Sequence, residues 1–238
     1  SLQYVPGSES AFAGVKRLPP GHYLLVQDGR IAVERYWTLR YSPKQRVSDA
    51  EAEEQTLDLL REATKLRLIS DVPLGAFLSG GVDSSLVVAL MAETGGAQVK
   101  TFSIGFEEQA YNELPYARLV AQRYGTDHHE DIVRPDALAL LPTLIWHYNE
   151  PFADSSAVPT MYLAQMTRRH VTVALNGDAG DENFAGYSRY VASLLAARVD
   201  RIPLSLRRVL ATLAGGAAVP NTLISRARRF LQAAAETP

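Results

Sequence analysis

Ser79-Gly-Gly-Val-Asp-Ser-Ser85 is the stretch of sequence that decides the fold, because of what lies on either side of it. It follows a short apolar run, residues 72–78, which is typical of a buried strand, and it precedes a helical pattern over residues 85–93. Gly80 and Gly81 allow the backbone to bend closely around a ligand, and the helix start adds unpaired N–H groups and a positive dipole end. A strand, a glycine-rich loop and a helix in this order predict a phosphate-binding loop in an α/β fold.

The loop does not follow the other common phosphate-binding patterns. It lacks the Lys of the Walker A motif, and its glycines do not match the dinucleotide pattern G-x-G-x-x-G. Asp83 stands where a Walker A loop places positive charge. A carboxylate repels a phosphate unless a cation lies between them, so Asp83 predicts bound Mg²⁺. The alternative is a capped helix after a glycine turn, since Asp is also a common residue at helix starts. That alternative explains single residues better than it explains the whole string after a buried strand.

The same alternation of short apolar runs and helical patterns continues along the chain. Further strands are predicted over residues 99–106, 127–133 and 171–175, and helices over residues 48–68, 114–124, 135–146 and 158–169. A second glycine-bearing loop, residues 176–186, follows the last of these strands. Strands that alternate with helices predict a doubly wound parallel sheet with helices on both faces.

The chain divides into three predicted parts. Residues 1–47 form a lead-in, in which the apolar runs 23–26 and 31–36 flank Asp28-Gly29 and predict a β-hairpin. Residues 48–190 form the α/β core, whose first helix starts with Ser48 and Glu51 at the spacing of a capping box. Residues 191–238 contain only helical patterns, rich in Ala, Leu and Arg.

Composition argues against several classes of protein. The 238 residues include 24 Lys and Arg and 26 Asp and Glu, a formal net charge of -2, so no nucleic-acid partner is expected. No apolar run approaches the roughly 18 residues that a membrane span needs, so no membrane partner is expected either. The sequence has no Cys, which excludes disulfides, thiolate metal sites and a thiol nucleophile within it. A chain without Cys fits the reducing cytoplasm, where we expect the protein, although export is also compatible with it.

Several segments, in order, carry a resemblance to a known family. They are residues 79–85, 101–106, 124–130, 150–156 and 177–187. On these segments the chain resembles the asparagine synthase family, within the PP-loop ATP pyrophosphatases. The resemblance implies an adenine nucleotide alpha hydrolase-like fold and an AMP-forming carbon–nitrogen ligase that uses ATP and Mg²⁺. The synthetase domain of such an enzyme adenylates the side-chain carboxylate of aspartate. Ammonia, released from glutamine by a separate N-terminal glutaminase domain, then displaces AMP. The predicted hairpin resembles the last part of that glutaminase domain, and a homodimer is a further expectation.

Carried over position by position, the resemblance assigns roles to residues of this chain. Asp83 and Asp181 would bind Mg²⁺, because both follow predicted strands and the carboxyl ends of parallel strands meet at one edge of an open sheet. Asp178 would take a proton from the attacking ammonium, and Tyr187 would orient the substrate. The residues implied to bind ATP are Leu78, Ser79, Gly80, Gly81, Asp83, Ser84, Ser85, Ile104, Asn176 and Gly177.

Other readings stay open for part of this set. The acidic residues at 178, 181 and 182 would also suit a solvated turn, and Tyr187 would also suit a packed aromatic position. His128 and His129 are adjacent on a predicted strand, so they point to opposite faces, and a structural role is favoured over a shared metal site. The segment implied to surround the acceptor acid contains Asp154, Ser155 and Ser156.

The chain also departs from the family pattern. It has no Cys to act as the glutaminase nucleophile, and no Lys follows Lys100, although family synthetase domains use a later Lys to stabilise charge on phosphate. Asn176 stands where the family often has Ser, and Asn183 where it usually has an apolar residue. Three hypotheses therefore compete. The first is an aspartate-activating synthetase domain, and the second is a relative that activates another carboxylate, as in β-lactam or lasso-peptide cyclases. The third is a catalytically incomplete nucleotide-binding fragment with a truncated helical extension.

Overall fold

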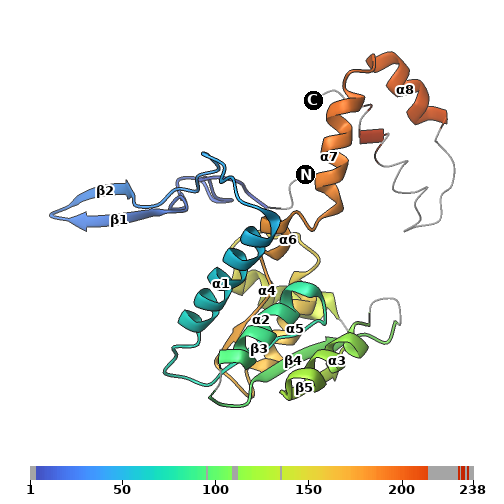
Figure 1. Ribbon diagram of the computed structural model, residues 1–238. Helices are drawn as coiled ribbons and strands as arrows, with labels where there is room; N and C mark the ends of the chain where they lie inside the picture. The colour runs from blue at the N-terminus through green and yellow to red at the C-terminus, as the bar shows by residue number, and fades with distance from the viewer. Residues whose placement is uncertain are drawn as a thin grey trace. The chain divides into compact units, whose positions relative to one another are not determined.

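The structure, a computed structural model, describes residues 4–94, 96–108, 112–134, 136–213, 230, 232, 233 and 235. The chain forms two compact units, Ser1–Gly177 and Asp178–Pro238. The first unit holds a four-stranded parallel sheet in the order β5-β4-β3-β6 (Figure 1). Its strands are β3 (Leu74–Phe77), β4 (Lys100–Gly105), β5 (Asp127–Ile132) and β6 (Val173–Leu175). The predicted parallel sheet is therefore confirmed.

The central strand β3 is apolar on both faces, as expected for a parallel strand that helices cover on each side. Ala76 and, just beyond the strand, Leu78 are buried in one apolar cluster. Phe77 points to the opposite face, where it packs in a second cluster around Phe102 of β4. Ala76 pairs with Thr101 of β4 on one side and with Leu175 of β6 on the other. β3 is thus hydrogen-bonded to a strand on each side and packed on both faces.

Helices cover both faces of the sheet, as the alternating pattern predicts. On the Ala76 face lie α2 (Val82–Thr94) and α3 (Leu114–Tyr124), and α1 (Asp49–Arg67) packs against α2. On the opposite face α5 (Ala157–Thr167) packs against Phe102, and α4 (Ala137–Tyr148) packs on α5. The buried residues that join the helices to the first face are Val88, Met91, Ala117 and Ala121.

The predicted capping signals operate where the sequence places them. Ser48 Oγ accepts a hydrogen bond from the Glu51 N–H at 3.3 Å, and Glu51 Oε2 accepts one from the Ser48 N–H at 2.8 Å. These two bonds form the capping box that starts α1. α3 ends at Gly125, which has the left-handed backbone (φ 62°) that glycine adopts without strain.

The structure differs from the prediction at both glycine-bearing loops. The helix after the glycine-rich loop begins at Val82 rather than at Ser85, so Asp83 lies within its first turn. A carboxylate is favourable in that turn because it faces the positive end of the helix dipole. The second glycine-bearing loop, residues 176–186, contains a short helix, α6 (Gly180–Phe184). Five residues are too few to show a helical period in a sequence, so α6 gave no signal.

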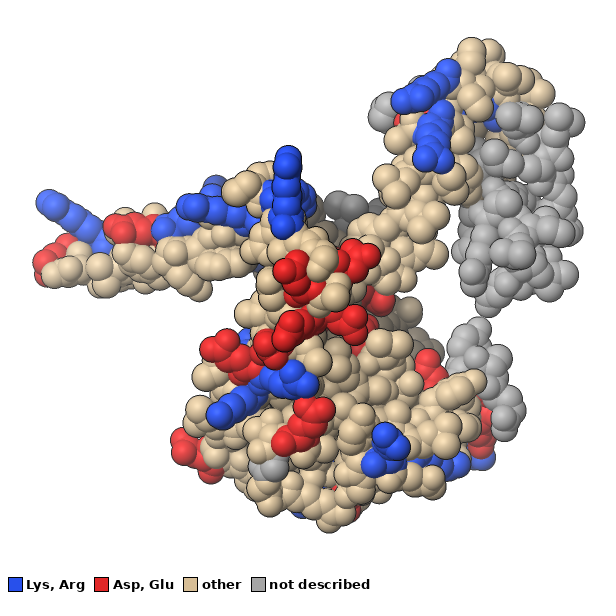
Figure 2. All heavy atoms as spheres, in the orientation of Figure 1, with Lys and Arg blue, Asp and Glu red and all other residues tan. Residues whose placement is uncertain are grey.

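The predicted hairpin is present in the lead-in. β1 (His22–Gln27) and β2 (Arg30–Arg35) pair antiparallel around Asp28 (φ 50°) and Gly29 (φ 75°). Positive φ at both central residues is the mark of a type I′ turn, which is why Asp-Gly predicts this connection. Charged side chains of both signs lie along the hairpin (Figure 2), and all of β2 is exposed.

The second unit is helical in the part that the structure describes. α6 is followed by α7 (Ser188–Val199) and α8 (Leu204–Leu213). Arg207 Nη1 donates to Asp200 Oδ1 at 2.7 Å, which ties α8 to the end of α7. The helical pattern predicted beyond residue 213 lies outside the described residues except at 230, 232, 233 and 235. Among the helices that are described, none has the length and apolar character needed to cross a membrane.

Candidate functional site

The glycine-rich loop, residues 79–85, is held in shape by its own serines. Ser79 Oγ and Ser84 Oγ lie 2.9 Å apart, and Ser84 Oγ accepts a hydrogen bond from the Ser79 N–H at 3.2 Å. Ser79 Oγ also accepts a hydrogen bond from the Gly81 N–H at 3.1 Å. These bonds lie within the loop itself, and internal bonds of this kind reduce the entropy that a loop loses when it binds a ligand.

The base of the loop is fixed by the neighbouring strand. The Leu78 N–H donates to the Phe102 carbonyl at 2.9 Å, and the Ser103 hydroxyl donates to the Leu78 carbonyl. The Leu78 side chain is buried, so only its backbone faces the loop. Sequence reasoning missed Ser103, which is 3% exposed. The available signal was a hydroxyl inside an apolar strand, because buried polar groups have partners.

The first turn of α2 supplies hydrogen-bond donors and a carboxylate at the same place. The N–H groups of Val82, Asp83 and Ser84 have no acceptor within the helix, whereas the Ser85 N–H bonds back to the Gly81 carbonyl at 3.1 Å. Such N–H groups, with the helix dipole, attract an anion. The Asp83 carboxylate is half-buried and has no hydrogen-bond or ion-pair partner among the described residues. The turn therefore has donors for an anion and an uncompensated negative charge for a cation.

Two glycines allow other segments to approach this loop closely. Gly80 has φ +84°, and a Cβ there would lie 2.5 Å from backbone atoms at the start of α3. Gly177 follows β6, and a Cβ there would lie 2.6 Å from the Ser84 nitrogen and 2.9 Å from the Asp83 carbonyl carbon. Any side chain at either position would push a backbone segment away from the loop. The end of β6 therefore forms one wall of the loop.

The order of the strands explains why these segments meet. The chain runs from β3 outward to β4 and β5, and then returns to place β6 on the other side of β3. The connections that leave β3 and β6 start from adjacent parallel strands at their carboxyl ends. In open α/β sheets this switch point is where ligands bind. Asn176, which is exposed, and Gly177 lie at this edge beside the loop.

Two other predicted ATP-binding residues belong to neighbouring parts of the first unit. Ser85 Oγ is buried and, within the described part of the chain, has no hydrogen-bond partner. An unsatisfied buried hydroxyl costs about 1–3 kcal/mol, which a bound ligand can offset. Ile104, near the carboxyl end of β4, is partly buried against the Phe102 cluster.

Asp178, Asp181 and Tyr187 lie in the second unit. Asp178 is exposed in the turn before α6, and Asp181 lies in the first turn of α6. The Asp181 carboxylate lies so close to Gly186 that a Cβ at that glycine would overlap its Oδ1. The Tyr187 hydroxyl donates to Glu182 Oε1 at 2.8 Å, and this bond is the main cause that raises the pKa of Tyr187. Tyr187 therefore carries a proton and a fixed orientation.

The predicted acceptor segment lies between α4 and α5. Asp154 Oδ1 accepts a hydrogen bond from the Ser156 N–H at 2.9 Å, and the Asp154 carbonyl accepts one from the Ala157 N–H at 3.2 Å. Asp154 thus orders the turn that leads into α5, whose N-cap residue is Ser156. Ser155 and Ser156 are exposed along with it, so the segment is open to a ligand.

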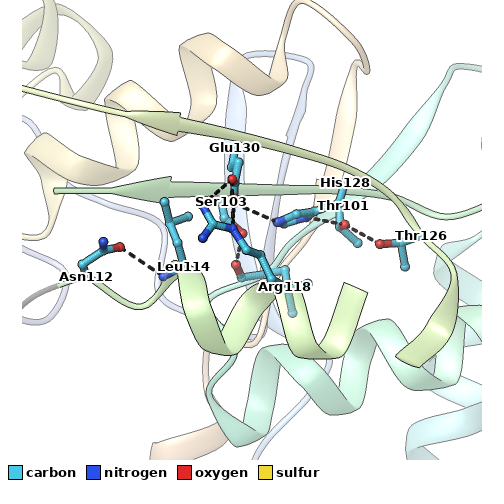
Figure 3. Close-up of polar contacts among 9 residues, drawn as sticks. Thr101, Ser103, Asn112, Leu114, Arg118, Thr126, His128 and Glu130 are labelled. Atoms are coloured by element: carbon cyan, nitrogen blue, oxygen red, sulfur yellow. Dashed lines mark hydrogen bonds and ion pairs between the residues drawn. The ribbon is translucent and has the colours of Figure 1, made fainter. Parts of the chain in front are cut away.

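His128 faces α3 from β5. Its Nδ1 lies 2.9 Å from Thr101 Oγ1 and its Nε2 lies 3.7 Å from Glu130 Oε2, and Glu130 in turn pairs with Arg118 (Figure 3). Burial is the main cause that lowers the pKa of His128. The contacts tie the edge strand to its neighbours, which favours the structural role.

His129 points to the other face of β5, as strand geometry predicts. Its ring lies 5.4 Å from that of Phe102 and 4.0 Å from that of His170, measured between centroids. Within the described residues, no three His, Cys, Asp or Glu side chains are grouped so that they could hold a metal ion. His128 and His129 thus contact different neighbours on opposite faces of β5.

A parallel sheet with a glycine-rich loop at its switch point defines an α/β protein with a candidate ligand site at the carboxyl edge of the sheet. The family model described as asparagine synthase matches residues 55–237. That match covers more than half of the sequence, and the chain therefore belongs to the asparagine synthase family.

Individual relatives match most of this chain at a moderate level of sequence identity. The chain is 35% identical over 212 residues to glutamine-hydrolysing asparagine synthetase 1 of Bacillus subtilis, a match that covers 88% of this chain and 33% of that protein. It is 32% identical over 212 residues to the amidase chyE of Penicillium rubens, covering 79% and 31%. An NH3-dependent NAD synthetase from Campylobacter jejuni aligns with a TM-score of 0.36 and 15% identity, covering 60% of this chain and 62% of that one. The chain spans about a third of the length of the Bacillus subtilis synthetase and of the Penicillium rubens amidase.

Proposed function

We propose that this chain is the synthetase part of a glutamine-dependent, cytoplasmic amidotransferase that activates the side-chain carboxylate of aspartate with ATP. An aspartate oxygen attacks the α-phosphorus, and pyrophosphate leaves. Ammonia, supplied by an N-terminal glutaminase domain of the full-length protein, attacks the acyl carbon, and AMP leaves. The observation that carries this proposal is the contact of Gly177 with Asp83 and Ser84, which joins two strand ends around an anion loop at the switch point. Membership of the asparagine synthase family supports the reaction class.

The loop would bind the phosphates that leave as pyrophosphate. The N–H groups of Val82, Asp83 and Ser84 are donors without helical acceptors, and the serine bonds fix their direction. Donors that are already aimed at developing charge stabilise a leaving group without reorganisation. The backbones of Leu78 and Gly177, with Ile104, would flank the adenosine.

The residues of the loop fit Mg²⁺. Asp83 offers carboxylate oxygens, the ligands that Mg²⁺ prefers, and none of the described residues neutralises its charge. Asp181 is our second candidate ligand, on the helix that opens the second unit. When bound, Mg²⁺ would neutralise charge on the phosphate oxygens.

The acceptor acid and the amine would be handled by other residues. Asp154, Ser155 and Ser156 would surround the acid, on the exposed turn before α5. Asp178 would accept the proton that ammonium loses before it attacks. Tyr187 would orient the substrate by accepting a hydrogen bond at its hydroxyl oxygen, because its one proton is donated to Glu182 and its pKa is raised.

Pyrophosphate release by the full-length protein tests the proposal. With Mg²⁺, ATP, aspartate and ammonia we expect equal amounts of AMP and pyrophosphate, and none without an acid. Activity with a different acid only would assign the chain to a relative with another acceptor, a second function that the 32% identity to an amidase favours. Binding of ATP without pyrophosphate release with any acid would contradict the proposal and indicate a nucleotide-binding module.

A further inference from the structure

Arg17 links the lead-in to the acceptor segment. Its Nη2 donates to Glu150 Oε1, across 133 positions of sequence, and its Nη1 donates to the Val5 carbonyl at 2.6 Å. The Arg17 N–H also bonds to the Ser8 carbonyl at 2.8 Å. Arg17 is thus fixed within its own loop while its guanidinium reaches Glu150.

The pair is more protected than most of the ion pairs among the described residues. The side chains of Arg17 and Glu150 are 34% and 23% exposed, whereas those of Arg61 and Glu93 are 47% and 53% exposed. Exposed pairs are worth little because solvent screens them, and hydrogen bonds between charged groups in a more protected setting are stronger. The pKa of Glu150 is lowered, chiefly by the bond from Arg17. Glu150 is therefore held as a carboxylate in a defined place.

Glu150 is the first residue of the segment implied to surround the acceptor acid. Pro151 follows and restricts the backbone. Phe152 then stacks on Tyr148 of α4, with ring centroids 4.4 Å apart, and Asp154 Oδ1 accepts from the Ser156 N–H just before α5. The segment is short, and its residues from 151 to 156 are exposed. Its position therefore depends on how firmly its two ends are held.

We propose that Arg17 is a positioning residue: by binding Glu150, it holds segment 150–156 where the acceptor acid binds. This inference rests on the proposed function of that segment. Arg17 suits the task because its planar guanidinium serves the Glu150 carboxylate and the Val5 carbonyl at once, whereas Lys has one nitrogen. The lead-in thereby supports the acceptor site through Glu150, and Arg17 itself does not contact the acid.

Hydrogen exchange in the full-length protein tests the positioning directly. In Arg17→Ala, the amides of Ser156 and Ala157, which bond to Asp154, should exchange about 10-fold faster, while the amides of α2 keep their protection. The matched control Arg61→Ala removes two exposed pairs, with Asp58 and Glu93, and should leave the exchange of Ser156 and Ala157 unchanged. Unchanged exchange of Ser156 and Ala157 in Arg17→Ala would overturn the inference, whether or not the protein is active.

Kinetics of pyrophosphate release then separate positioning from general destabilisation. In Arg17→Ala the KM for the acid should rise about 10-fold or more, because small misplacements of a binding group have large effects, while the KM for ATP changes less than about twofold. Arg17→Lys keeps the charge and should give an intermediate KM for the acid. Equal rises in both KM values, or no difference between Lys and Ala, would overturn the inference. If the wild-type protein uses no acid at all, the proposed function fails, and the exchange experiment alone decides on Arg17.

Discussion

Replacement of Gly177 by Ala perturbs the contact between the end of β6 and the glycine-rich loop. The added Cβ would lie 2.6 Å from the Ser84 nitrogen and 2.9 Å from the Asp83 carbonyl carbon and Cβ, where ordinary contact begins at 3.4 Å. Most of these atoms are backbone in the first turn of α2, so no side-chain rotation relieves the overlap. Either β6 or the start of α2 has to move.

The size of the effect follows from the overlap. To restore normal contact, the two segments must separate by roughly 0.8 Å, and overpacking of this kind costs about 1–3 kcal/mol. For a chain of this size that lowers Tm by roughly 2–12 °C. If opening of the loop relieves the strain, ATP binding weakens by up to the same free energy, which corresponds to about 5- to 150-fold.

Calorimetric titration with ATP and Mg²⁺, together with thermal unfolding, measures both effects. The matched control is Gly75→Ala, whose Cβ would lie 2.7 Å from Phe102 Cε2 and 2.8 Å from the Lys100 carbonyl oxygen, inside the sheet. It should lower Tm as well, but change the ATP affinity of the folded protein less than about twofold. If Gly177→Ala keeps both the wild-type Tm and the wild-type ATP affinity, β6 does not form the wall of the loop, and our reasoning is refuted.

Three more outcomes are expected. Asp83→Ala should abolish the Mg²⁺-dependent part of ATP binding, because it removes the carboxylate of the first turn of α2; calorimetry that finds the same Mg²⁺ dependence as in the wild type would remove the metal assignment. Ser48→Ala should lower the free energy of unfolding in urea by about 1 kcal/mol, and an unchanged midpoint would mean that the capping box with Glu51 contributes nothing. An NMR titration of the His128 imidazole should give a pKa below 6.5, and a midpoint at or above 6.5 would contradict burial as the cause. As pH falls through 6.5 the unfolded chain binds the proton first, so stability should decrease, and His128→Asn should flatten this dependence.

Local chemistry made a large part of the fold predictable from the sequence. The Ser48 capping box, the turn at Asp28-Gly29 and the helix over residues 114–124 each depend on a few neighbouring residues, and each is found where it is predicted. The glycine-rich loop was located in the same way. The start of α2 at Val82 was not, because residues 82–85 belong both to the loop string and to the first turn of the helix.

What the sequence could not show depends on distant partners. Nothing near β6 indicates that it pairs with β3 rather than with β5, so the close approach of Gly177 to Asp83 and Ser84 could not be predicted from the sequence. Arg17 and Glu150 are 133 positions apart and look like ordinary surface charges in the sequence. The two predicted ligands for Mg²⁺, Asp83 and Asp181, stay predictions, and they lie in different units of the chain.

The order of the strands has a consequence for synthesis on the ribosome. About 100 residues separate the end of β3 from the end of β6, and translation at roughly 5–20 residues per second needs about 5–20 s to make them. A nascent chain thus carries the loop for that time before the strand that forms its wall has been made. Nucleotide capture by ribosome-bound chains of increasing length should therefore begin only after residues 173–177 have left the exit tunnel, and would time the completion of the sheet.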